Sequence, residues 1–284
     1  MILRFYSKLG YKRGKRSCRL KRCGMDLATS EIGLSMLYCL GTPFKKMIAE
    51  IPNVQATHIE IVDDGLHALN RKKAERLNEI GKSYGKRYAM HAPFAGVNIA
   101  VPTKSLLNAT LKRLKESIVN SSLLNCEMWV FHPGMRTGIS MFYPGSDWTR
   151  NLESVRLLVK FAGDHGVKVS IENVGEPFVV RNVEEFRRFF NEVGEDVDLA
   201  LDVGHAHMMG QVDSFLTEFP DKIVHVHAHD NYGKRDEHLG IGYGSIGWER
   251  FAGLLKKTSR DKVVIVESFE HIDESMQKLR QLLA

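Results

Sequence analysis

Short apolar runs alternate with longer amphipathic stretches along most of the chain, from about residue 31 onward. The longer stretches place apolar residues at helical spacing, as with Leu69, Ala74, Leu77 and Ile80 within residues 67–84. This alternation is typical of repeated strand-helix units around a parallel sheet. We predict eight strands, at residues 32–38, 58–62, 87–91, 128–132, 168–172, 198–202, 222–229 and 263–267.

The segments between these strands predict the helices. Their expected ranges are residues 43–50, 67–84, 104–124, a stretch beginning near 147, 183–193, 212–219, 248–257 and 273–283. Asp147 or Thr149 is a candidate cap for the helix that begins near residue 147. Eight units of roughly 32 residues match the size of a (β/α)8 TIM barrel. We therefore predict an α/β fold with one TIM-barrel domain at residues 25–284, preceded by a basic extension at residues 1–24.

Charge is distributed unevenly along the chain. Nine of the 40 Lys and Arg residues and none of the 34 acidic residues lie in residues 1–24, so the remainder carries 31 basic against 34 acidic groups, a net charge of −3. The overall net charge of +6 therefore says little about what the barrel binds. We expect the extension to be a disordered arm or a stretch upstream of a true start at Met25, although a basic segment can also contact nucleic acid or act as a transit peptide.

Cysteine and hydropathy patterns indicate the compartment. The four cysteines (Cys18, Cys23, Cys39 and Cys126) form no Cys-x-x-Cys pair, and free thiols are typical of a reducing compartment. No run of 18 apolar residues is present, so no transmembrane helix is predicted. We expect a cytoplasmic protein without a membrane partner.

Polar residues stand at the carboxyl end of nearly every predicted strand. They are Glu60, His91, His132, Glu172, Asp202 with His205, His227 with Asp236 and His238, and Glu267. Successive members are separated by about one strand-helix unit, so their side chains should converge on one axis. The active sites of TIM barrels are built at this face, whereas the opposite face serves stability.

The segment from His225 to Gly247 is the densest part of this pattern. It mixes four histidines with three carboxylates, a combination that suits zinc, manganese or iron better than calcium. We expect His225, His227 and His229 to share one face of a buried strand. The glycines of this segment, among them Gly242 and Gly244, predict a mobile backbone whose N–H groups could approach a phosphate.

Several of these segments together resemble the xylose isomerase-like TIM-barrel superfamily, also called AP endonuclease family 2. The matching segments are His91-Ala-Pro-Phe, Phe131-His132-Pro-Gly, Ile171-Glu172-Asn, Leu201-Asp202-Val-Gly-His205, His227-Ala-His-Asp-Asn, Asp236-Glu-His238-Leu-Gly and Val266-Glu267-Ser. The superfamily includes sugar isomerases and epimerases, sugar-phosphate enzymes and endonuclease IV.

Similarity to the mononuclear isomerases and epimerases implies one divalent metal (Zn, Mn, Co or Mg) held by Glu172, Asp202, His227 and Glu267. In those relatives paired glutamates transfer a proton, here Glu172 and Glu267, and His205 would contact a small sugar or sugar phosphate. Their further substrate glutamate falls here on Phe178, and their arginine is matched only loosely. We therefore take as candidate substrate-binding residues Glu60, Lys234, Arg235, Gly242 and Gly244.

Similarity to endonuclease IV implies a different activity on the same residues. Its three-zinc site would map onto His91, His132, Glu172, Asp202, His205, His227, Asp236, His238 and Glu267, and the substrate would be DNA at abasic sites. The loop after His91 lacks a longer apolar wedge, and short units leave little room for DNA-gripping insertions. A third alternative is a barrel that keeps the ligands as a binding module, which the cost of unpaired buried charges disfavours.

Overall fold

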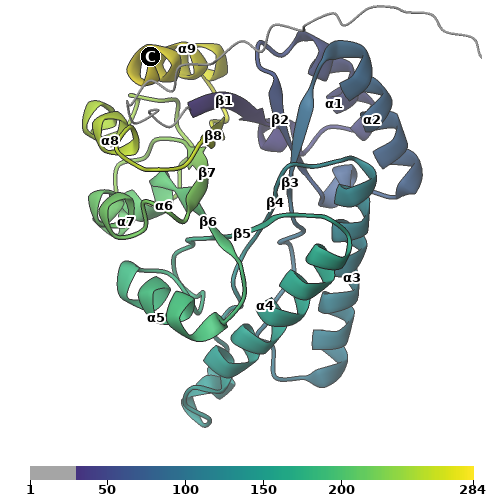
Figure 1. Cartoon of the computed structure of the whole chain (residues 1–284), viewed down its shortest axis with the longest axis vertical. Helices are drawn as coiled ribbons and strands as arrows, with labels where there is room; N and C mark the ends of the chain where they lie inside the picture. The colour runs from purple at the N-terminus through teal and green to yellow at the C-terminus, as the bar shows by residue number, and fades with distance from the viewer. Residues whose placement is uncertain (1–29) are drawn as a thin grey trace, which may run out of the picture.

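The computed structural model describes residues 30–284, so the basic extension of residues 1–24 lies outside the described residues. Eight parallel strands close into a barrel in chain order, with the first bonded to the last. Figure 1 shows the strands as an inner ring with the helices outside it. The strands are β1 (Ser30–Ser35), β2 (His58–Val62), β3 (Arg87–His91), β4 (Trp129–Phe131), β5 (Val169–Glu172), β6 (Asp198–Asp202), β7 (Ile223–Ala228) and β8 (Lys262–Val266). The predicted TIM barrel is confirmed.

Helices connect each strand to the next. Within residues 30–284 the α-helices are α1 (Phe44–Glu50), α2 (Arg71–Tyr84), α3 (Lys104–Leu123), α4 (Ser146–Asp164), α5 (Val183–Val193), α6 (Val203–Met208), α7 (Val212–Glu218), α8 (Trp248–Leu255) and α9 (Ile272–Leu283). Short 3-10 turns are η1 (Met36–Cys39), η2 (Ile51–Asn53), η3 (Gly65–His67) and η4 (Gly138–Met141). None of these helices is long and apolar enough to span a membrane.

Most boundaries fall within two residues of the predicted ones, and the larger differences concern β1, α2 and α6. Strand β1 ends at Ser35, its last residue paired with β2, and the chain then tightens into η1 instead of continuing to residue 38. Helix α2 begins at Arg71 because the Asn70 side chain accepts the N–H of Lys73 and caps the helix there. Helix α6 was not predicted, and it starts where Asp202 accepts the N–H of His205.

The predicted caps of helix α4 are wrong. The helix starts one residue before Asp147, and its cap is Gly145, with a positive φ of 81° and no side-chain cap bond. The carboxylate of Asp147 accepts the N–H of Trp148 within the first turn. A negative charge in this first turn still complements the positive end of the helix dipole.

Part of the barrel interior beneath the polar strand ends is apolar, although the buried Glu60 and His225 pair with Ala89 and Ala200 at the same level. Ala89, Val130 and Ala200 belong to a small buried cluster together with Met128 and Val224. Side chains alternate along a strand, so Ala89, Val130 and Ala200 share a face with the residues two places later, His91, His132 and Asp202. These apolar side chains thus lie beneath the polar strand ends.

Strand pairing brings the polar ends to the same level. Asp202 pairs with His227 across a register shift between β6 and β7, and Glu172 pairs with Ala200. Outside the barrel, helical side chains such as Phe186 and Phe189 are completely buried. Burial of each such side chain stabilises the folded state by about 1.5 to 3 kcal/mol, and this packing fixes the helices against the strands that carry the site.

Candidate metal centre

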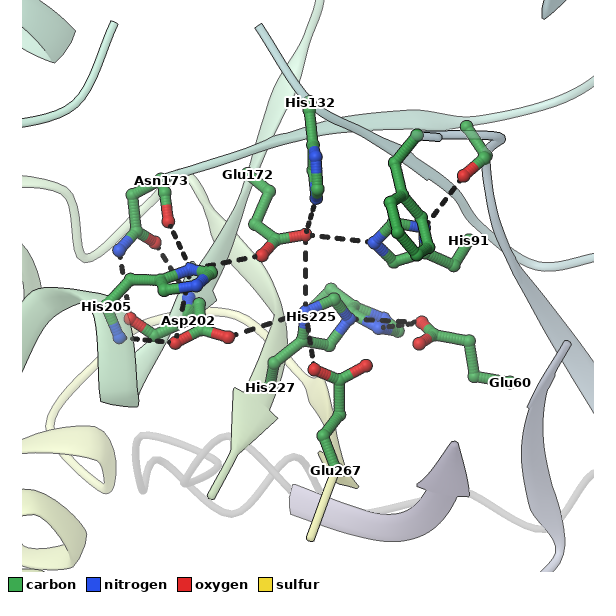
Figure 2. A network of polar contacts seen from close by, with 12 residues as sticks. Glu60, His91, His132, Glu172, Asn173, Asp202, His205, His225, His227 and Glu267 are labelled. Carbon is green, nitrogen blue, oxygen red and sulfur yellow. Dashed lines mark hydrogen bonds and ion pairs between the residues drawn. The ribbon is translucent and has the colours of Figure 1, made fainter. Parts of the chain in front are cut away.

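Four side chains from four adjacent strands meet among the polar strand ends. The Nδ1 atom of His227 lies 3.4 Å from Glu172 Oε2, 3.6 Å from Glu267 Oε2 and 4.0 Å from Asp202 Oδ2. Figure 2 shows Glu172 and Glu267 on opposite sides of His227. All four side chains are buried. We call this set the central position.

The central position fits a divalent metal. Glu172 Oε2, His227 Nδ1 and Glu267 Oε1 are buried and have no hydrogen-bond partner, although other groups of the set lie within ion-pair range. Buried polar atoms without partners are costly, and a cation is the natural group to satisfy Glu172 Oε2 and His227 Nδ1 together, since Glu172, Asp202 and His227 have ligand atoms within 4.8 Å of one another. Imidazole with carboxylates is a donor set for zinc, manganese or a similar metal.

His91 and His132 extend the central position on one side. The Nε2 atoms of both rings lie 3.3 Å from Glu172 Oε2, and the two rings meet edge to face at 4.9 Å. The Nδ1 atom of His91 faces the carbonyl of Ala92 at 2.8 Å, which leaves Nε2 directed at the site. His91, His132 and Glu172 therefore offer a second set of ligand atoms that shares Glu172 with the first.

His205, Asp236 and His238 form a third set, which we call the outer position. Asp236 Oδ2 lies 3.2 Å from the Nε2 atoms of both His205 and His238. Its side chain is 38% exposed, in contrast to the buried central ligands. The loop that carries Asp236 and His238 is held by a bridge between Asp230 and Leu239 and by a 2.8 Å contact from His238 Nδ1 to the carbonyl of Glu267.

The structure thus brings together all nine residues taken from the two resemblances. His229 joins them, although neither resemblance includes it among the ligands. Its ring is completely buried, with Nε2 3.2 Å from Asp202 Oδ2 and 3.6 Å from Asp236 Oδ1. The density of histidines after β7 is the signal that points to it in the sequence.

Glu60 has a different setting from the one expected of a substrate-binding residue. It is completely buried, and its Oε2 atom lies 2.8 Å from His225 Nε2 and 3.2 Å from His227 Nε2. Figure 2 shows it on the far side of these two rings from Glu172. Glu60 therefore contacts the candidate ligand His227 through Nε2, the ring nitrogen that faces away from the central position.

The other expected substrate-binding residues lie on the loop after β7. Lys234 and Arg235 are exposed beside Asp236. The N–H of Gly242 donates to Asp230 Oδ2 at 2.8 Å, and a Cβ on Gly244 would overlap Asp230 Oδ1. The glycines thus pack around a buried carboxylate, and the N–H of Gly242 already has a partner.

Aromatic rings line the histidines of the site. Phe94 meets His91 edge to face at 5.5 Å, and Phe178, at the place of the relatives' substrate glutamate, meets His132 edge to face at 5.4 Å. Phe269 stacks on His238 at 4.8 Å and is 50% exposed. Three phenylalanine rings therefore give the candidate ligands His91, His132 and His238 apolar neighbours.

The two central glutamates have opposite pKa shifts. Burial raises the pKa of Glu267 and outweighs the attraction of His227. Burial also opposes ionisation of Glu172, but the charges of His132 and His227 hold the pKa of Glu172 well below its usual range. In this pair Glu267 therefore retains its proton to a higher pH than an ordinary glutamate, whereas Glu172 stays ionised to a lower pH.

Residues 51–283 match the family model described as xylose isomerase-like TIM barrel. An uncharacterized protein of Methanocaldococcus jannaschii is 28% identical over 262 residues, 89% of each chain. A probable endonuclease 4 of Halothermothrix orenii is 27% identical over 194 residues, covering 61% of this chain and 68% of its own.

A crystal structure of a D-tagatose 3-epimerase-like protein is similar in three dimensions. It superposes with a TM-score of 0.84 at 26% identity, over 89% of this chain and 97% of its own. The family model covers most of the barrel, including every strand end that contributes to the central position. The chain therefore belongs to the xylose isomerase-like TIM barrel family.

Proposed function

We propose that the protein is a divalent-metal-dependent isomerase or epimerase of a small sugar, in which Glu172 and Glu267 transfer the proton. The observation that carries this proposal is the placement of the two carboxylates on either side of His227 Nδ1, at 3.4 and 3.6 Å. The 26% identical D-tagatose 3-epimerase-like structure supports the same class of reaction.

The chemistry requires a base and an acid around one substrate carbon. One glutamate removes the proton from the carbon next to the carbonyl, and the electron pair shifts onto the carbonyl oxygen. The other glutamate then returns a proton to the opposite face of the same carbon in an epimerase. In an isomerase the proton returns to the former carbonyl carbon, and the hydroxyl proton of the neighbouring carbon passes to the former carbonyl oxygen. A divalent metal at the central position would polarise the carbonyl and an adjacent hydroxyl.

Deuterium uptake from heavy water into a panel of ketoses and ketose phosphates tests the proton step. We expect exchange at the carbon next to the carbonyl with at least one sugar. The variant E267Q keeps the size of the side chain and removes one of the two proton-transferring carboxylates, so it should slow exchange by about 10²- to 10⁴-fold. The matched control is E79Q, because Glu79 is exposed on α2. Metal content is measured on each variant, and absence of exchange with every sugar would contradict the proposal.

A second candidate function is a metal-dependent endonuclease that cleaves DNA at abasic sites. The observation that favours it is that candidate ligand groups around Glu172 and Asp202 adjoin the contacts of Asp236 with His205 and His238, together with the 27% identical probable endonuclease 4. Neighbouring metals in such a site stabilise both oxygens of a phosphodiester displacement. Metal-dependent nicking of abasic DNA without sugar exchange would establish this function in place of the first.

A further inference from the structure

His229 connects the central and outer positions. It follows β7 directly, and its buried ring lies between Asp202 and Asp236. Its other face stacks on His238, with ring centroids 3.9 Å apart and planes at 16°. One side chain thus contacts a carboxylate of the central position and a histidine of the outer one.

The stacking excludes His229 and His238 as joint ligands of one ion. A metal bound to an imidazole lies near the plane of the ring, about 2.0 to 2.1 Å from the nitrogen. Two nearly parallel rings whose centroids are 3.9 Å apart cannot place one ion in both planes. Nε2 of His229 instead has Asp202 Oδ2 as its hydrogen-bond partner at 3.2 Å, and Nδ1 has no partner. His229 also forms a candidate ligand group with Asp202 and His205, but the contact with the acceptor Asp202 and the unpartnered Nδ1 favour an Nε2–H donor.

The neighbouring helix is shaped to admit this ring. A Cβ on Gly204, in the first turn of α6, would overlap the imidazole of His229. The same turn is held by Asp202, whose Oδ1 atom accepts the N–H of His205 at 2.6 Å. The two oxygens of Asp202 are thus oriented by two separate donors, one on α6 and one on His229.

We propose that His229 is a positioning residue that couples the two metal positions. It donates to Asp202 and stacks on His238, so an ion that orders one position also orders the other. This inference rests on metal binding at both the central and the outer position, of which the proposed isomerase or epimerase requires only the central one, and not on the identity of the substrate. Loss of sugar exchange with metal binding intact would therefore contradict the proposed function alone.

Two variants separate the donor from the stack. H229F keeps an aromatic ring over His238 and loses the N–H, whereas H229Q keeps a donor near the place of Nε2 and loses the ring. Both are titrated, as metal-free protein, with Co²⁺ by calorimetry and visible absorption. We expect H229F to weaken the central position and H229Q the outer one, each by about 10- to 100-fold, the usual effect of removing a partner of a ligand.

Coupling is measured with D236N, which removes an outer ligand. In the wild type, D236N should weaken the central position by about 5-fold or more, and in the H229F background it should have no further effect. Unchanged Co²⁺ affinities in both His229 variants, or fewer than two Co²⁺ ions bound by the wild type, would overturn the proposal. Loss of a nitrogen ligand from the Co²⁺ spectrum of H229F would also overturn it, because His229 would then be a direct ligand.

A measurement on the wild type keeps the proposal testable if the variants fail to fold. The ¹⁵N chemical shifts of the His229 ring report which nitrogen carries the proton. We expect the proton on Nε2 and a bare Nδ1, as the contact with Asp202 requires. A proton on Nδ1 alone would contradict the donor role.

Discussion

The contact between Glu60 and His227 shows how a single buried carboxylate prepares a ligand. The Nε2 atom of His227 lies 3.2 Å from Glu60 Oε2. The other ring nitrogen, Nδ1, is therefore left to face Glu172, Asp202 and Glu267. Carboxylates behind ligating histidines fix the tautomer and the orientation of the ring. His225 shares the same oxygen of Glu60, and this second contact keeps the carboxylate in place.

Replacement of Glu60 by Gln is expected to weaken metal binding by about 10- to 100-fold, because the amide no longer fixes the tautomer of His227. The change preserves side-chain size, so the barrel should still close. E127Q is a matched control. Glu127 also contacts a histidine, with its Oε2 atom 3.0 Å from His58 Nε2, but it belongs to none of the candidate ligand sets. Calorimetric titration with Zn²⁺ measures both, and equal affinity in E60Q and the wild type would show that Glu60 has no positioning role.

At this scale the sequence predicted positions better than roles. The nine ligand candidates could be found because they stand at or shortly after six strand ends that follow one another by about one unit. The setting of Glu60 could not, because it depends on a contact across the barrel with residues more than 160 positions away. The sequence predicts His229 only as part of a strand face. Its contact with Asp202 depends on the absence of a side chain at Gly204, whose Cβ would overlap the imidazole.

At the scale of elements, the loop after β7 departs most from its prediction. The sequence predicts a mobile glycine run open to a phosphate, but Asp230 organises the loop from inside. Its carboxylate accepts the N–H groups of Gly242 and Ile246 and the indole N–H of Trp248. The strands were predictable from their apolar runs, whereas these turns depend on one buried acid whose partners lie up to 18 residues away.

Gly244→Ala is expected to destabilise the protein by about 1 to 3 kcal/mol, the usual cost of overpacking. Its Cβ would overlap Asp230 Oδ1 and lie 2.5 Å from the carbonyl oxygen of Asn231, which is backbone and cannot move aside. G253A is the control, because a Cβ there meets open space in α8 and should stabilise the helix by roughly 0.5 to 1 kcal/mol. Urea unfolding compares them, and equal effects of the two variants would refute this account of the loop.

At the scale of the whole molecule, the closed barrel accounts for the convergence of the site. The regular spacing of strand ends predicted that convergence, and the eight strands lie within residues 30–284. We expect deletion of residues 1–24 to leave the melting temperature and metal affinity unchanged, because every candidate ligand lies on the barrel. A large loss of either in the chain starting at Met25 would show that the basic segment contributes to the fold.

Stability of the whole molecule should depend on pH in opposite ways with and without metal. Burial alone would lower the pKa of His91 and of His238, but Glu172 and Asp236 respectively raise each to about 9. The usual value is 6.5, so in metal-free protein these groups contribute stability that is present below pH 6.5 and lost as the pH rises toward 9. Metal binding requires neutral imidazoles and therefore strengthens over the same range. The difference in melting temperature between metal-loaded and chelator-treated protein should widen from pH 6.5 to 9, as measured by calorimetry. A constant or shrinking difference would mean that these histidines are not metal ligands, since ligands must release their protons when the ion binds.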